Sequence, residues 1–286
     1  MIAKNKELLN IITVDVEDWY QVENYASVIP RHDWSNMEFR VERNIDLILE
    51  IFELEKIKAT FFILGWIAEK FPNIVKKIAN QEHEIASHGW SHKPIWDIEK
   101  EEFGNEIKQS RLLLSDLSGQ SVLGYRAPTF SITEKTLWAF EVLVEEGYKY
   151  DSSIFPVHHD RYGIPNASLD IHKRNEGIWE IPLTVLEIGP FHLPICCGGY
   201  MRLYPLLLTQ YAITKANKRG RPAVILVHPW EFDPQQPRIK GIGLFKQFRH
   251  HVGIKNNKSK LENLINKNKF APAKEVISLL GAKISE

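Results

Sequence analysis

Cysteine is scarce in the 286-residue chain: there are two, and they are the neighbours Cys196 and Cys197. Adjacent cysteines rarely reach the geometry of a disulfide, and two thiolates are too few for a thiolate metal site. The sequence therefore predicts no disulfide framework and no zinc-finger type of site. We interpret the pair as buried or pocket-lining side chains.

Long apolar runs are also missing. No stretch of about 20 apolar residues occurs anywhere, and residues 1–10 hold no apolar run of signal-peptide length. We therefore expect no transmembrane segment and a cytoplasmic location, with peripheral association with a membrane left open.

The chain has no excess of charge of either sign. Its 36 Lys and Arg residues balance 36 Asp and Glu residues, so the formal net charge is zero. This balance supplies no electrostatic attraction to DNA or RNA, and we expect no nucleic-acid partner.

The remaining composition is that of an ordinary globular protein, with 44% hydrophobic residues. Its length suits one large catalytic domain. We expect a single domain over residues 1–286, with a core over about residues 10–235 and a C-terminal helical extension over about residues 236–286.

Segments of strand and helix character alternate along the chain. Apolar, β-branched runs predict short strands, and amphipathic stretches predict the helices between them. Expected strands cover residues 9–14, 59–64, 84–87, 122–125, 148–151, 178–183 and 224–227, and expected helices cover residues 39–55, 67–79, 98–117 and 134–146. Repeated strand–helix units of roughly 30 residues favour an α/β fold with a parallel sheet, open or closed.

Ionisable residues follow five of these expected strands. In chain order they are Asp15, Glu17, Asp18, His88, His92, Arg126, Asp151 and His228. Because the carboxyl ends of parallel strands meet at one edge of a sheet, we expect these side chains to share a site.

Two histidines in the segment Ser-His-Gly-Trp-Ser-His, residues 87–92, are candidate metal ligands. His88 and His92 are four residues apart, so on one helical turn both imidazoles would face the same way. Surface histidines reach the same spacing by chance. An acidic cluster at another strand end favours the ligand interpretation, because two imidazoles and one carboxylate leave positions for water and substrate.

That acidic cluster consists of Asp15, Glu17 and Asp18. Metal-assisted hydrolysis needs one carboxylate as a ligand and another as the general base. Strand alternation places Asp15 and Glu17 on one face, and Asp18 joins them if the chain turns. The alternative is a solvated acidic turn, although three carboxylates this close repel one another unless a cation lies among them.

His228 directly follows an apolar run and needs a polar partner. Either a hydrogen bond in the core or a role as an acid catalyst would satisfy it. Arg126 and Asp151 are the candidates for orienting the charged groups, and a lone Arg or Asp at a strand end is more often an ion-pair anchor.

Four motifs, in this order, resemble the polysaccharide deacetylase family: Thr-Val-Asp-Val-Glu-Asp, Ser-His-Gly-Trp-Ser-His, Arg-Ala-Pro and Leu-Val-His. Further segments, including Cys-Gly-Gly-Tyr-Met-Arg-Leu-Tyr-Pro and His-Pro-Trp-Glu-Phe-Asp-Pro, resemble the branch found with exosortase-type exopolysaccharide systems. The resemblance runs over about residues 10–278. It implies a distorted (β/α) barrel with about seven parallel strands.

The resemblance implies a catalytic role for four residues. Asp15 would be the general base, and His228 would be the general acid that protonates the leaving amine. Arg126 would hold Asp15 ionised and oriented, and Asp151 would do the same for His228.

The resemblance also implies the metal ligands, with one departure. His88 and His92 would bind a divalent metal, with zinc the expected ion. The common family motif has two adjacent aspartates, whereas here Val16 follows the first one. The carboxylate ligand is therefore Glu17 or Asp18; strand phase favours Glu17, and Asp18 stays open.

Four further residues are candidates for contacting the substrate. Leu226 matches the position that lines the pocket for the acetyl methyl group, and Trp179 is expected in the wall of that pocket. Tyr200 and Arg202, after two glycines, are expected in a substrate loop.

The implied activity is that of a metal-dependent hydrolase acting on carbon–nitrogen bonds other than peptide bonds. It would remove N-acetyl groups from an N-acetylated glycan or from a lipid-linked or nucleotide-linked sugar precursor. Two alternatives stay open: an amidase acting on a small non-sugar or cyclic amide, and a non-catalytic sugar-binding subunit.

Overall fold

The fold centres on a curled parallel sheet, described over residues 8–281 of a computed structural model. Seven strands run parallel in the order β10-β1-β2-β3-β4-β5-β7, antiparallel β6 follows at the edge, and β11 pairs with the start of β1. The strand bounds are β1 Asn10–Val16, β2 Thr60–Ile63, β3 Glu84–Ser87, β4 Gly124–Tyr125, β5 Tyr150–Asp151, β6 His172–Lys173, β7 Trp179–Glu180, β10 Val224–Val227 and β11 Phe270–Ala271. The predicted α/β fold with about seven parallel strands is confirmed.

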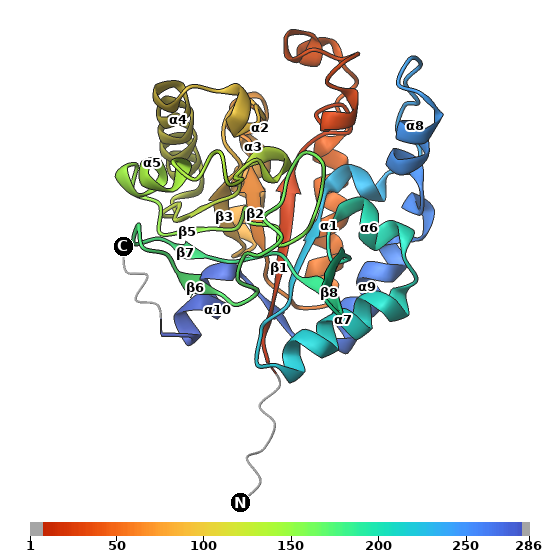
Figure 1. The fold of residues 1–286 in the computed structure, drawn as a ribbon. Helices are drawn as coiled ribbons and strands as arrows, with labels where there is room; N and C mark the ends of the chain where they lie inside the picture. The colour runs from red at the N-terminus through yellow and green to blue at the C-terminus, as the bar shows by residue number, and fades with distance from the viewer. Residues whose placement is uncertain (1–7, 282–286) are drawn as a thin grey trace, which may run out of the picture.

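Helices cover the outer face of this sheet. Figure 1 shows β1 in the middle of the view, with α4 and α5 to its left and α6, α7 and α9 to its right. The bounds are α1 Val41–Leu54, α2 Gly65–Lys70, α3 Pro72–Asn80, α4 Lys100–Ser118, α5 Ala139–Glu145, α6 Gly198–Leu203, α7 Leu206–Lys218, α8 Leu244–His251, α9 Asn257–Lys267 and α10 Ala273–Leu279. A separate hairpin joins β8, Val185–Ile188, to β9, Phe191–Pro194.

Side-chain alternation in β1 divides the interior into two apolar clusters. Ile12 and Val14 pack in the cluster between the sheet and the helices, whereas Ile11 packs inside the curl with side chains of β2, β3, β5 and β10. All seven residues of β1 are buried. Inward-facing positions change from Ile11 to Thr13 and then Asp15 toward the carboxyl end, so the strand itself places a carboxylate at that end of the barrel.

One expectation about the helices needs correction. Residues 67–79 form two helices, because Pro72 has no N–H to continue α2 and instead begins α3. The segment after residue 235 holds α8, α9 and α10 but also β11, which pairs with β1. The division into a core and an extension stays a prediction.

Gly124 in β4 allows close packing inside the curl. A Cβ atom there would lie 2.1 Å from Cζ of Tyr150, which is fully buried. We expect Gly124→Ala to lower the free energy of unfolding by about 1–3 kcal/mol in urea denaturation. The control is Gly104→Ala in α4, where the nearest atom is 3.4 Å away and the substitution should leave stability unchanged or raised. A Gly124→Ala protein as stable as wild type would contradict this packing.

None of the helices within residues 8–281 is both long enough and apolar enough to cross a bilayer.

Candidate active site

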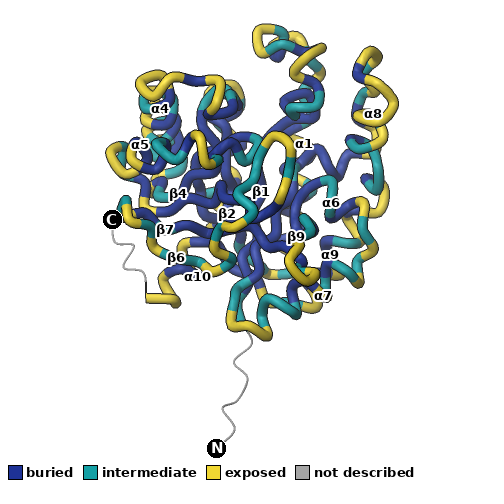
Figure 2. The backbone as a smooth tube through the Cα atoms, in the orientation of Figure 1, coloured by how far each residue is buried: buried dark blue, intermediate teal, exposed yellow. Residues whose placement is uncertain are grey.

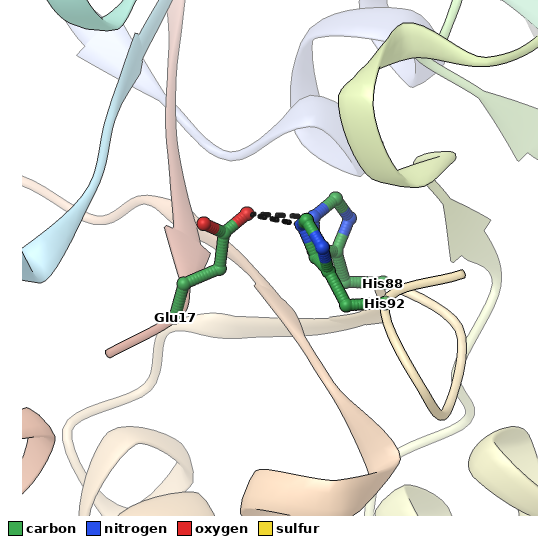
Figure 3. A group of neighbouring side chains, drawn as sticks. All are labelled: Glu17, His88 and His92. Carbon is green, nitrogen blue, oxygen red and sulfur yellow. Dashed lines mark hydrogen bonds and ion pairs between the residues drawn. The ribbon is translucent and has the colours of Figure 1, made fainter. Parts of the chain in front are cut away.

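Glu17, His88 and His92 converge just beyond the carboxyl ends of β1 and β3 (Figure 3). Oε1 of Glu17 lies 3.1 Å from Nε2 of His88 and 3.0 Å from Nε2 of His92, and all three residues are buried. Ligands of a four-coordinate zinc ion with bonds near 2.1 Å lie about 3.3 Å apart. The spacing of these three atoms therefore fits one shared divalent cation.

The tautomer of His88 supports the same conclusion. Its Nδ1 lies 2.8 Å from the backbone carbonyl oxygen of Arg126, which can only accept, so Nδ1 carries the proton. This leaves Nε2 as the ring nitrogen that faces Oε1 of Glu17. A metal-binding histidine is commonly held through its other nitrogen in this way.

The local conformation predicted for the two histidines was wrong. Residues 88–92 form a loop and not a helical turn, with positive φ angles at Gly89 (75°) and His92 (55°). The backbone oxygens of Gly89 and Trp90 accept hydrogen bonds from the first two residues of α2, which holds the loop in place. The left-handed turn at His92 brings its ring to 5.4 Å from that of His88.

The predicted pairing of Asp15 with Arg126 is present. Nη1 of Arg126 donates to Oδ1 of Asp15 at 2.8 Å and to Thr13 Oγ1 at 2.8 Å, and the other donors of this fully buried guanidinium go to Ser152. The second oxygen of Asp15 lies 3.9 Å from Nε2 of His88. Arg126 therefore keeps a carboxylate oriented beside the candidate metal centre.

His228 also lies close to Glu17. Its Nε2 is 4.0 Å from Oε1 of Glu17, and its Nδ1 is 3.2 Å from Oε2 of Glu231. Burial by itself lowers the pKa of His228, but the carboxylates of Glu17 and Glu231 outweigh burial and raise the pKa to about 9. The imidazolium form is therefore favoured at neutral pH.

Glu231, which sequence reasoning missed, is the partner of His228. It also accepts the backbone N–H of His228 at 2.9 Å, in the short helix Pro229–Phe232. The pattern His-Pro-Trp-Glu carried this information, since an acid three residues after a helix start can turn back to that residue.

Arg202, predicted in a substrate loop, lies in α6 and contacts Glu231. Its buried guanidinium donates to Oε1 of Glu231 at 2.7 Å and to the carbonyl oxygens of His250 and Val252 at 2.8 and 2.6 Å. Arg202 thus orients Glu231, and its donors are occupied within the chain.

The predicted pairing of Asp151 with His228 was wrong. Asp151 accepts the backbone N–H and the hydroxyl of Ser153 and lies beside Glu180; within residues 8–281 it makes no hydrogen bond to His228. Burial, and then the nearby Asp151 carboxylate, raise the pKa of Glu180 well above its usual range. Asp151 and Glu180 are the last residues of β5 and β7, and they contact each other and not His228.

The carboxylate of Asp18 accepts hydrogen bonds from the backbone. Its carboxylate accepts the N–H groups of Trp19, Arg40 and Val41 at 2.7 to 3.0 Å, where α1 begins. Of the two acids, Glu17 is therefore the candidate metal ligand, because Asp18 points to the start of α1 and caps that helix.

One cavity opens over these groups. Asp15, Glu17, His92 and His228 line it, together with three of the predicted substrate residues, Leu226, Tyr200 and Arg202. Cys197 also lines it, as expected for one of the two cysteines. Trp179, by contrast, is in β7 and packs against the inner apolar cluster, outside the set of lining residues described for this cavity.

Family models divide the chain into two parts. Residues 35–150 match the model described as polysaccharide deacetylase, and residues 152–278 match a domain of unknown function, DUF3473. The first part contributes His88, His92 and Arg126, the second contributes His228 and Glu231, and the acids at the end of β1 precede both. The active-site groups thus come from segments that sequence comparison treats separately.

Similar proteins carry consistent names. The chain is 42% identical over 95 residues to a peptidoglycan-N-acetylglucosamine deacetylase of Bacillus cereus, covering 33% of this chain and 34% of that protein. It is 32% identical over 159 residues to a peptidoglycan deacetylase of Helicobacter pylori, covering 54% of this chain and 52% of that protein. The chain thus matches only a third to a half of the length of these relatives.

The fold has a counterpart among solved structures. A Mycobacterium smegmatis protein, provisionally assigned as a polysaccharide deacetylase, superposes with a TM-score of 0.64 over 99% of this chain and 93% of that one, at 15% identity. This similarity confirms the predicted distorted (β/α) barrel of the polysaccharide deacetylase type. Sequence matches and fold agree: residues 35–150 of this chain match the polysaccharide deacetylase family.

Proposed function

We propose that the chain is a metal-dependent hydrolase that removes N-acetyl groups from an N-acetylated sugar of a polysaccharide or its precursor. The observation that carries the proposal is the placement of five groups: Asp15, Glu17, His92 and His228 line one cavity, and His88 lies 3.1 Å from Oε1 of Glu17. Glu17 and two histidines form a ligand set, and Asp15 and His228 flank it within reach of the same bound acetyl group.

Glu17, His88 and His92 would hold the cation, and zinc suits this donor set. When bound, the cation polarises the acetyl carbonyl and lowers the pKa of the attacking water. Burial raises the pKa of Glu17, but the nearby His92 and His228 lower it by a larger amount. The pKa of Glu17 therefore lies well below its usual range. Glu17 is thus anionic and ready to bind a cation.

Asp15 and His228 would move the two protons that hydrolysis requires. Asp15, oriented by Arg126, accepts a proton from the attacking water. His228, held as imidazolium by Glu231, donates a proton from Nε2 to the nitrogen of the leaving amine. The products are acetate and a free amino sugar. Leu226 is buried in the cavity wall, where it suits contact with the acetyl methyl group.

The relatives' names support a glycan substrate, because the matched deacetylases act by name on peptidoglycan or its N-acetylglucosamine. The resemblance in the C-terminal half favours an exopolysaccharide or its precursor as the polymer for this chain.

Acetate release tests the proposal. The protein is dialysed against a chelator, reloaded with zinc, and incubated with N-acetylated oligosaccharides and, in parallel, with small non-sugar amides. We expect acetate from the sugars with zinc and none in the presence of the chelator. Hydrolysis of the small amides alone would point to an amidase, and sugar binding without acetate release would point to a non-catalytic subunit; either result overturns the proposal.

Glu231→Gln tests the assignment of the acid. Glu231 raises the pKa of His228, and it is not among the candidate metal ligands, so its effect persists when a cation binds Glu17. Removing its charge lowers the pKa of His228, and the protonated acid is then lost at lower pH. We expect the alkaline limb of kcat against pH to move toward lower pH, with zinc content unchanged. An alkaline limb that stays in place would refute the assignment.

A further inference from the structure

Helix α8 presents an apolar face to solvent at the rim of the active site. Leu244 is 88% exposed, Phe245 72% and Phe248 56%, three large apolar side chains within five residues. Figure 1 shows α8 standing out at the upper right, at the edge where β1 ends, and Figure 2 shows much of its outer part exposed. Such a cluster normally marks an interaction surface.

The surroundings of this face are strongly basic. Between Asp233 and Glu262 the chain has no acid and seven basic residues, Arg238, Lys240, Lys246, Arg249, Lys255, Lys258 and Lys260. Four of them, Arg238, Lys240, Lys246 and Lys255, are exposed and form no ion pair within the described part of the chain. Because the whole chain is neutral, this charge is a local feature of the α8 segment.

The inner end of α8 is anchored at the active site. The ring of His250 stacks on Trp230 at 4.5 Å, and its backbone oxygen accepts from Arg202. Phe248 and Arg249 line the same cavity as Asp15 and His228. The exposed end of the helix therefore stands at a defined position beside the cavity mouth.

We propose that α8 docks the chain onto an anionic lipid bilayer. Leu244 and Phe245 enter the boundary between headgroups and acyl chains, and the basic residues Arg238, Lys240 and Lys246 lie against lipid phosphates. A short amphipathic helix with Leu and Phe on one side and Lys and Arg around them has the chemistry of interfacial binding. A symmetric pair of chains meeting through this face would instead bring two basic segments together.

Docking would also place the cavity mouth at the level of the headgroups. A glycan carried on a lipid, or growing at a membrane surface, would present its N-acetyl groups there. This consequence rests on the proposed function, whereas the docking itself does not.

Vesicle co-sedimentation of the full chain tests the docking. Phosphatidylcholine vesicles are compared with vesicles that also contain phosphatidylglycerol, at low and high salt. We expect binding to the anionic vesicles that weakens with salt and is much weaker on phosphatidylcholine alone. The double substitution Leu244→Ser with Phe245→Ser should reduce affinity by about tenfold or more. Lys240→Gln with Lys246→Gln should reduce it by about fivefold per residue.

Leu207→Ser is the matched control, because Leu207 is 77% exposed on α7, outside the α8 segment. It should bind vesicles as wild type does. Absence of binding to anionic vesicles, an equal loss in the control, or a dimer that the α8 substitutions dissociate would each overturn the docking proposal. Acetate release from a soluble oligosaccharide should be unchanged in the Leu244 and Phe245 variant. A wild-type protein that binds vesicles but releases no acetate would instead refute the proposed function alone.

Discussion

Replacing His88 with Ala is expected to abolish metal binding and hydrolysis together. His88 supplies one of three candidate ligand atoms, and its Nε2 lies 3.1 Å from Oε1 of Glu17. Losing one of three protein ligands should weaken zinc binding by about a thousandfold. Isothermal titration with zinc gives the affinity, and acetate release gives the activity, which should fall to the background level.

His32→Ala is the control for this variant, because the His32 side chain is 81% exposed and is not among the candidate ligands. It should bind zinc and release acetate as wild type does. The melting temperature of the metal-free proteins separates ligand loss from unfolding, since His88 also donates to the carbonyl oxygen of Arg126. A folded His88→Ala protein with wild-type zinc affinity would rule out the proposed metal centre.

Replacing Asp15 with Asn is expected to lower kcat by about 10² to 10⁴-fold while zinc stays bound. The amide oxygen can still accept the hydrogen bond that Nη1 of Arg126 gives to Oδ1, so the side chain keeps its place. An amide cannot take a proton from water, however, so the base is lost. The three candidate ligands are unchanged, and zinc content should stay near that of wild type.

Asp18→Asn is the matched control, an identical chemical change three positions along the chain. Asp18 accepts two backbone N–H groups at the start of α1 and that of Trp19, so its replacement should lower the free energy of unfolding by about 1–2 kcal/mol. Its kcat should remain near that of wild type. If Asp15→Asn kept kcat within about tenfold, or if Asp18→Asn lost activity with its zinc bound, the assignment of the base would be wrong.

Local patterns predicted most of the sheet and its main helices. The strands Glu84–Ser87 and Val224–Val227 have the predicted bounds, because short apolar runs between turns have a clear period. The hairpin β8–β9 and the two-residue strands β6 and β11 were not predicted. β6 and β11 exist because a neighbouring strand offers them hydrogen bonds, and a local pattern does not show such a partner.

Pairings between distant residues were harder to predict than the residues themselves. Arg126 and Asp15 were correctly paired because both positions match motifs of one family. Asp151 was assigned to His228 from the same family resemblance, but the sheet order separates β5 from β10 by β4, β3, β2 and β1. His228 instead takes the acid three residues later in its own segment, Glu231.

The amino-acid sequence by itself determined which chemical groups this protein can use. They are the two imidazoles of residues 88 and 92, the acids after the first strand, and the histidine after the strand at residues 224–227. It also determined the parallel sheet, because apolar runs and amphipathic stretches alternate along the chain. Only the tertiary structure decided how Asp18 is used. It accepts the backbone N–H groups of Arg40 and Val41, which are 22 and 23 residues away in the chain and reach it only after folding, and Glu17 is the acid that faces the histidines.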